Sequence, residues 1–353
     1  MTPSFEKFIP TKSEAWRFSG FKGLDLSLYK EKGSTSVKNS KGMLVQGDFG
    51  DDPIGMPDAL ALPFRDFGSA EVEKLTFEKN RFWHIKTPQA TRGEIYCRHH
   101  HLRDTSLLKF RALIEVEPDA TLNYVGKLKT TKQGSCSATA SRMVVAAGAA
   151  LDFVLINDLS SDAINFNFIE IEAQENSKIN LTILNLGSAY TRQEITAILK
   201  GRGADVKLRS LSIAKGAQEI DQRTLQIHEA PNAKSDLLFK NILSDNARTI
   251  FSGMIRVASG AQKTDAYQKN CNLLLSDDAL ANSLPGLEIE ADDVRCSHGA
   301  TCGKLDLEEL FYLRSRGIPE AEAKQMLVGG FCQEILAGLQ ENLRAEIDKR
   351  PTL

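Results

Sequence analysis

The strongest constraint on the fold of this chain is a turn signal that recurs at a nearly fixed interval. From Glu94 onward, a Gly, Asn or Asp followed by a small residue returns about every 28 positions at first and about every 14 later, a period typical of a solenoid with stacked coils. The pairs are Asp119-Ala120, Gly148-Ala149, Asn176-Ser177, Gly203-Ala204, Asn232-Ala233, Asn246-Ala247 and Gly260-Ala261, with weaker signals at Gly134, Asp162-Ala163, Ser188-Ala189 and Gly216-Ala217.

The segments between these turns have the character of short β-strands. In the last of them, Leu287 and Ile289 fall on one face with Ala291, and Glu288 and Glu290 fall on the other. Such strands could also form an antiparallel sandwich or barrel, but the Asn-Gly and Asp-Gly hairpin signals are absent. We expect strands at residues 151–156, 179–184, 206–213, 250–257 and 287–291.

After Asp306 the apolar period changes to that of helices. Asp306 has the properties of an N-cap and Glu309 completes a capping box, while Gly317 is placed to end the helix as a C′ residue. Pro319 suits the first position of the next helix. The expected apolar positions are Leu307, Leu310 and Phe311 in the first helix, then Ala323, Leu327, Phe331 and Ile335, continued by Leu339, Leu343 and Ile347.

Composition excludes several classes of protein. Lys and Arg total 44 against 46 Asp and Glu, so no nucleic-acid or anionic-membrane partner is indicated. The N-terminus carries charges where a signal peptide needs an apolar core, and the longest apolar run, from Met143 to Leu151, is too short to span a bilayer. Six scattered cysteines form neither a disulfide framework nor a Cys-x-x-Cys site. We therefore expect a cytoplasmic protein.

The densest group of side chains that could bind a metal ion or react lies just before the helices. Cys296 and His298 project from one face if the backbone is extended, Cys302 follows, and Gly299 and Gly303 permit a sharp exit from the strand. A thiolate and an imidazole can bind iron. The same residues could instead pack inward beneath the last coil, and the residues alone leave both readings open.

This region resembles the SufB/SufD family of iron–sulfur cluster assembly proteins, and its D-type branch most closely. The resemblance rests on CSHGAT at 296–301, LFYLRSRGI at 310–318 and the Gly-Gly-Phe at 329–331, and on AQKTDAYQ, NLLLS and LEIEADDV upstream. It is specific over residues 201–331 and weak before Glu94. The resemblance implies a right-handed parallel β-helix over residues 94–303, after an irregular and helical region over 1–93 and before a helical domain over 304–353.

The resemblance also implies a function. It indicates a scaffold without catalytic activity of its own, which pairs with a SufB-type subunit, or with itself, and with the ABC-type ATPase SufC. The family implicates the histidine matching His298 in cluster assembly at the B–D interface, beside Cys296. A transient iron–sulfur cluster is expected there, and no tightly bound cofactor. Two ligands are too few for a closed site, so a partner must supply the rest. The expected ATPase-docking surface comprises Leu310, Phe311, Arg314, Arg316, Met326, Leu327 and Phe331, and these helices could also cap the solenoid.

One departure from the family favours the D-type subunit. B-type members carry an essential cysteine where this chain has Asn270, and the neighbouring Cys271 would lie on the opposite face of the strand. A role for this chain as sulfur acceptor is therefore in doubt.

Other candidate sites are weaker. The run from Cys97 to His101 resembles a metal site, but an alternating strand can point only Cys97, His99 and His101 one way, which favours a structural or surface role. His228 lacks a second histidine four residues on, and neither Gly-Lys pair belongs to a P-loop, so the chain is not itself an ATPase. Two alternatives remain: a polysaccharide-active β-helix enzyme, for which Glu288, Glu290 and Arg256 are the only hint, and a homodimeric interaction module without metal chemistry.

Overall fold

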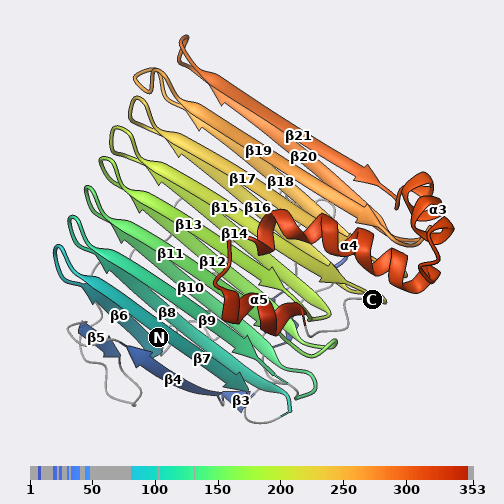
Figure 1. Ribbon diagram of the computed structural model, residues 1–353. Coiled ribbons are helices and arrows are strands. Elements are labelled where there is room, and N and C mark those ends of the chain that lie inside the picture. The colour runs from blue at the N-terminus through green and yellow to red at the C-terminus, as the bar shows by residue number, and fades with distance from the viewer. Residues whose placement is uncertain are drawn as a thin grey trace.

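The computed structural model describes residues 7–8, 19–21, 24–25, 30–31, 33–39, 44–47, 81–101, 104–130 and 132–348. In this part of the chain, successive strands alternate between two long sheets that lie face to face, and the C-terminal helices α4 (Glu320–Leu336) and α5 (Glu341–Asp348) lie across one of them (Figure 1). The helical character expected for the N-terminal region falls outside the described residues.

We refer to the two sheets as the even and the odd sheet, after their strand numbers. The even sheet contains β6 (Arg81–Thr87), β8 (Ser106–Val116), β10 (Cys136–Val145), β12 (Ile164–Ala173), β14 (Tyr190–Leu199), β16 (Glu219–His228), β18 (Arg248–Val257) and β20 (Leu280–Ile289). The odd sheet contains β7 (Arg92–His101), β9 (Thr121–Lys129), β11 (Ala150–Asp158), β13 (Lys178–Asn185), β15 (Asp205–Ala214), β17 (Lys234–Leu243), β19 (Asp265–Leu274) and β21 (Arg295–Gly303).

Short N-terminal strands and C-terminal helices complete the described structure. β4 pairs antiparallel with β7, and β5 pairs antiparallel with β6, so both sheets are extended at the first coil. The N-terminal strands are β1 (Lys7–Phe8), β2 (Leu24–Asp25), β3 (Lys30–Glu31), β4 (Gly33–Asn39) and β5 (Leu44–Gly47). The helices are α3 (Leu307–Ser315), α4 (Glu320–Leu336) and α5 (Glu341–Asp348).

Every strand from β6 to β19 pairs in parallel with the strand two further along the chain. Arg142 and Glu170, for example, are register partners 28 residues apart. This confirms the expected parallel β-helix, and the parallel ladder already includes β6, which begins at Arg81. The strands expected at 151–156, 179–184, 206–213 and 250–257 lie inside β11, β13, β15 and β18, but β20 begins at Leu280 and ends before Ala291.

The recurring turn signal has a backbone cause. Asp119, Gly148, Asn176, Gly203 and Asn232 all have a left-handed backbone, with φ between 53° and 70°. Gly and Asn adopt this conformation most readily. The small residue that follows is buried at each corner, where a larger side chain would have no space. A Cβ on Gly203 would lie 2.4 Å from the side-chain oxygen of Asn176, so stacked turns also restrict one another.

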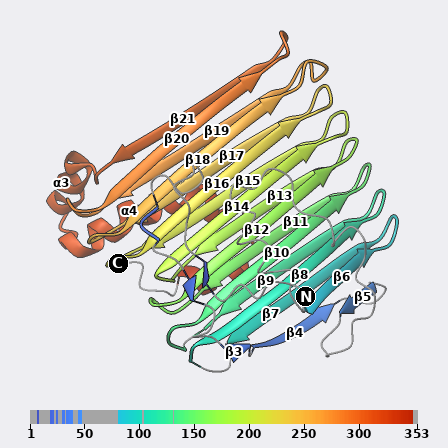
Figure 2. The same ribbon diagram turned by 180° about the vertical axis from the view of Figure 1, so that it is seen from behind.

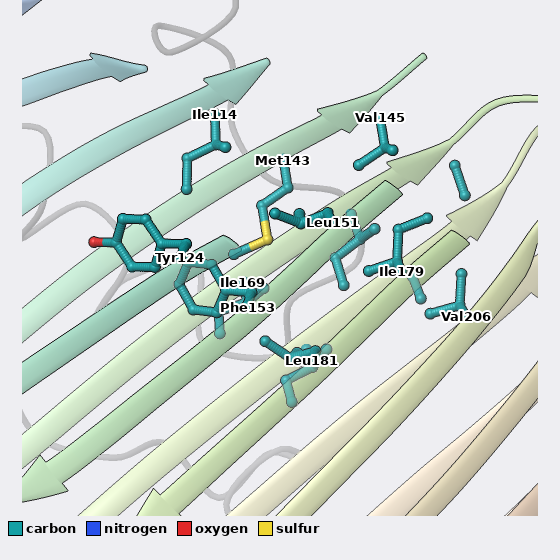
Figure 3. Close-up of a cluster of buried hydrophobic side chains, with 14 of the residues drawn as sticks. Ile114, Tyr124, Met143, Val145, Leu151, Phe153, Ile169, Ile179, Leu181 and Val206 are labelled. Atoms are coloured by element: carbon teal, nitrogen blue, oxygen red, sulfur yellow. The ribbon is translucent and has the colours of Figure 1, made fainter. Parts of the chain in front are cut away.

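Side chains that alternate along the strands fill the space between the two sheets. In the early coils they are aliphatic and aromatic, and they interdigitate from both sides (Figure 3). Tyr124 and Phe153, from neighbouring odd strands, stack with ring centroids 4.4 Å apart. This continuous buried cluster supplies most of the apolar burial that stabilises the solenoid.

The helices α4 and α5 cover part of the outer face of the odd sheet, whereas the even sheet faces away from them (Figure 2). Lys240 on β17 donates to the Phe331 carbonyl at 2.9 Å and pairs with Glu334 at 2.8 Å. Leu327 and Phe331, which were expected in the apolar stripe, are only partly buried. The buried residues of α4, α5 and the turn between them are Ala323, Val328, Cys332, Ile335, Leu336, Leu339, Leu343 and Ile347.

The expected helix ends are largely confirmed. Asp306 caps α3 by accepting from the backbone N–H groups of Glu308 and Glu309 at 2.8 and 3.2 Å, and Gly317 follows α3 with φ of 86°. Pro319, expected as the first residue of the next helix, is instead its N-cap residue.

Candidate functional site

The solenoid is open at its C-terminal end. β20 and β21 are the outermost strands of their sheets, and no described strand lies beyond them (Figure 1). Interior side chains that are buried in earlier coils are therefore accessible here: Ser283 and Leu287 on β20 are half-buried, and Ile289 is 39% exposed. This end contrasts with the first coil, where β4 and β5 pair with the sheets.

The thiol and imidazole singled out in the sequence lie on this open end. Cys296, His298 and Cys302 are register partners of Ala266, Gln268 and Asn272, and these three residues of β19 are buried in the interior. All three side chains of β21 therefore project from the interior face of the last strand. The sequence reading of Cys296 and His298 as residues of one face is correct.

The strand ends at Gly303, one of the two glycines expected to permit the exit, and not at Gly299. β21 continues through Gly299, the register partner of Lys269, and ends at Gly303. Pairing with β19 keeps this stretch extended although two glycines permit a turn. As a consequence Cys302 joins the interior face, which the sequence reasoning missed because it stopped the alternation too early.

The three side chains differ in exposure. Cys296 is half-buried, whereas His298 and Cys302 are exposed. Burial raises the pKa of Cys296, and the nearby charge of Asp265 acts in the same direction, while a backbone hydrogen bond from Ala266 opposes the shift. The Cys296 thiol is therefore a neutral group near pH 7 unless a metal ion or a partner's positive charge displaces its proton.

A polar network adjoins these side chains inside the last coils. Asn272 donates to Asn270 at 2.8 Å and to the Thr301 carbonyl at 3.1 Å, and Ser283 donates to Asn270 at 2.7 Å. The signal for this network in the sequence is the alternating run of Gln268, Asn270 and Asn272.

Asn270 and Cys271 lie on opposite faces of β19, as the sequence predicted. Asn270 is fully buried in the interior. Cys271 is the register partner of Lys240 and packs on the outer face of the odd sheet, in the apolar cluster formed with α4 and α5. Its thiol is buried away from the open end and cannot act there.

A second candidate surface is the apolar face of α3 and α4. Phe311 is 72% exposed, and Leu307, Tyr312 and Met326 are also exposed. A shallow hollow of about 420 Å³ lies among Glu308, Glu309, Tyr312, Leu313 and Leu327. Of Leu307, Leu310 and Phe311, which were expected as the apolar positions of this helix, only Leu310 is buried.

The remaining residues expected at this surface are spread over both helices. Arg314 pairs with Glu320 at 3.4 Å, and Arg316 lies over the Tyr312 ring, 5.3 Å from its centroid. Phe331 is partly buried, and its carbonyl is held by Lys240. Tyr312, which the sequence reasoning missed, extends the apolar face beside Phe311.

The other sequence candidates do not form a site. Cys97 and His99 are buried, with Sγ and Nε2 3.1 Å apart, and the His99 ring stacks on Phe110 at 4.1 Å. Burial raises the pKa of Cys97 to about 12. Across the described residues, no three His, Cys, Asp or Glu side chains are grouped to hold a metal ion. Arg256 and Glu288, the hint of a glycan-active enzyme, form an exposed ion pair at 3.1 Å.

The comparisons with known proteins identify the family. The family described as SUF system FeS cluster assembly, SufBD core domain, matches residues 101–331. The chain belongs to this family. The match runs from β7 into α4, so it extends well upstream of residue 201, where we expected the specific resemblance to begin.

Individual relatives of the SufBD family agree. Iron-sulfur cluster assembly protein SufD of Escherichia coli (strain K12) is 40% identical over 170 residues, 47% of this chain and 40% of the relative. SufD of Bacillus subtilis (strain 168) is 27% identical over 259 residues, 71% of this chain and 59% of the relative. The SufBD family protein Mb1497 of Mycobacterium bovis is 34% identical over 218 residues, 58% and 55% of the two chains. The chain thus spans about half the length of the curated relatives it matches.

In the described part of the chain, no helix is long and apolar enough to cross a membrane.

Proposed function

We propose that this chain is a D-type scaffold subunit that pairs with a SufB-type subunit and the ATPase SufC to assemble iron–sulfur clusters. The observation that carries the proposal is the open end of the solenoid, where Cys296 and His298 leave one face of the last strand. One thiol and one imidazole can hold iron only in part. A second subunit that covers this end would complete the ligand set.

Pairing with a subunit of the same fold suits the geometry of this end. β20 and β21 each present one unpaired edge, and the interior side chains beside them are partly accessible. Strand edges of this kind readily pair with strands of another chain. Stacking two solenoid ends would bury the half-exposed interior side chains and place Cys296 and His298 between two subunits. The cluster itself is the cargo of such an assembly and is not a resident cofactor.

The helical surface suits a second partner. Phe311, Tyr312 and Met326 expose apolar area on α3 and α4, and α3 lies close to the open end (Figure 1). Exposed aromatic groups beside arginines are typical of the energetic centre of protein interfaces. The residues Leu307, Phe311, Tyr312, Met326, Arg314 and Arg316 are therefore the surface we assign to the ATPase.

The decisive experiment compares His298→Ala with Ser297→Ala in the co-expressed complex. Both positions are exposed on β21, but Ser297 projects from the outer face, as the register partner of Tyr267. We expect His298→Ala to retain both partner subunits and to lack iron and acid-labile sulfide, whereas Ser297→Ala keeps all three. Cys296→Ala should have the smaller effect, because a partner's thiolate replaces one ligand more easily than a positioned imidazole.

The outcome that contradicts the proposal is equally clear. If His298→Ala accumulates clusters at the wild-type level in cells, the open end is not the assembly site. If the chain purifies only as a homodimer and carries no iron when co-expressed with both partners, it is an interaction module without metal chemistry.

A further inference from the structure

The interior of the solenoid changes character along its length. Aliphatic and aromatic side chains dominate the interior of the early coils (Figure 3), although Asn165 and Asn167 on β12 also face it. From β14 onward, amide and hydroxyl groups occupy many interior positions. Their hydrogen bonds cross from one sheet to the other: Gln222 donates to Ser210 at 3.1 Å, and Gln226 donates to Gln268 at 3.3 Å. These side chains therefore face one another inside the later coils.

Several of these buried polar atoms have no hydrogen-bond partner among the described residues. They are Nε2 of Gln193, Oε1 of Gln222, Oγ1 of Thr224, Oε1 of Gln226, Oδ1 of Asn241 and Nδ2 of Asn270. The six side chains are between 0% and 6% exposed. Each unpaired buried group destabilises the fold, and six together would rival the whole free energy of unfolding. A bound molecule must therefore satisfy them.

The chemistry of the unpaired atoms identifies the kind of molecule. The set contains amide nitrogens, which only donate, and amide oxygens, which only accept. No Asp, Glu, Lys or Arg occupies an interior position in β14 to β21, and burial lowers the pKa of His228 to about 4, so its ring is neutral near pH 7. An ion would lack a compensating charge in this space. Water both donates and accepts, and it is the usual partner of such groups.

Small side chains replace larger apolar ones at several interior positions, although the amide of Gln268 fills the space beside Gly253. Ser210 on the odd sheet and Thr224 and Gly253 on the even sheet occupy interior positions that hold leucine and isoleucine in earlier coils. We propose that the interior from β14 to the open end holds a column of ordered water molecules bound to these amide and hydroxyl groups.

The column would reach solvent at the candidate site. Gln268 and Asn272 are register partners of His298 and Cys302. Ser283 on β20, which accepts a hydrogen bond from Asn272, is half-buried, so the polar interior side chains continue to the accessible end. The exposed imidazole and thiol therefore border this hydrated interior. This inference stands independently of the assembly function.

A crystal structure of the full chain at about 1.5 Å resolution tests the column directly. We expect ordered water within about 3.2 Å of Oε1 of Gln222 and Oδ1 of Asn241. If these atoms are paired only with protein groups, or face an empty space without density, the proposal is wrong.

Water-¹⁷O relaxation dispersion gives a second test in solution. The wild-type protein should show buried water with long residence times. Gln222→Met, which has a similar shape but no amide, should lose part of this signal. Gln89→Met, at an exposed turn, should not. Equal signals from all three proteins would overturn the proposal, and if Gln222→Met fails to fold, the crystal structure decides.

Discussion

The burial of His228 predicts a specific loss of stability on mild acidification. The imidazole faces the interior of β16 and its Nε2 lies 2.8 Å from the Ser235 hydroxyl. Burial lowers the pKa of His228 from 6.5 to about 4. His228 is therefore protonated near pH 6.5 in the unfolded chain but only near pH 4 in the folded chain. Stability from this residue is fully present above pH 6.5 and is lost as the pH falls toward 4.

The magnitude follows from the two pKa values. Between pH 7 and pH 5, proton uptake by the unfolded state lowers the free energy of unfolding by about 2 kcal/mol. Glu219 has a pKa raised by burial, which acts in the opposite direction, so the wild-type curve alone is not diagnostic. The comparison with His228→Gln removes this and all other shared titrations, because glutamine can still donate to Ser235 but carries no titrating ring.

The assay is urea unfolding of both proteins at intervals from pH 7.5 to 5. We expect the difference in unfolding free energy between wild type and His228→Gln to change by about 2 kcal/mol over this range, with the variant gaining relative stability at low pH. Parallel pH profiles for the two proteins would refute the reasoning, since they would mean that His228 is protonated as easily in the folded state as in the unfolded chain.

Three further predictions address the docking surface, the solenoid and its interior. Phe311→Asp should change the free energy of unfolding by less than about 0.5 kcal/mol, because this side chain is 72% exposed, yet weaken SufC binding about 30-fold in calorimetry. Gln325→Asp, at an exposed position of α4, is the control, and equal affinities would exclude α3 from the interface. Two residues inserted at Gly203-Ala204 should lower the free energy of unfolding, measured by urea titration, far less than one residue inserted inside β13. The insertion in β13 moves Leu181 and Ile183 to the opposite face of the strand. Equal losses from the two insertions would argue against the stacked coils. Phe251→Ala should cost about 3–5 kcal/mol, because this ring is fully buried 5.7 Å from Phe239, and a cost below 1 kcal/mol would contradict the packing.

The structure itself gives a reason to expect the turn insertion to be tolerated. The connection from β14 to β15 covers residues 200–204, whereas the one from β18 to β19 covers residues 258–264 and is two residues longer. The following strands keep their parallel register in both cases. The corner of a coil can therefore accommodate extra residues that the strand ladder cannot.

The solenoid was predictable because its corners have local causes. A left-handed residue such as Asn176 or Gly203 and the small buried residue after it are required at every coil, so they recur in the sequence without any shared motif. The same locality explains the cap at Asp306 and the helix end at Gly317. Each depends on the chain within a few residues of itself.

The parts that failed depend on neighbours distant in sequence. Periodicity placed Leu307 and Phe311 on a face of α3, but it does not say whether another element covers that face, and both are exposed. Gly299 permits a turn, yet hydrogen bonds to β19 hold it in a strand. That Cys296 and His298 project from the same face of the strand was predictable, because side chains alternate along an extended backbone. The extent of the site, which includes Cys302 and the network around Asn272, was not, because it required the register of β19 against β21.

The chemistry of the open end indicates how tightly a partner should bind there. The interior positions that it exposes are mixed: His298, Cys302 and Ser283 are polar, whereas Leu287 and Ile289 on β20 are apolar. Permanent subunit interfaces are more apolar than this and bury the equivalent of a protein core. An end of mixed polarity can stay in water without a partner and be covered without a large loss of hydrogen bonds, because bridging water can serve both states. Such an end suits an interface that must admit iron and sulfide and release a finished cluster.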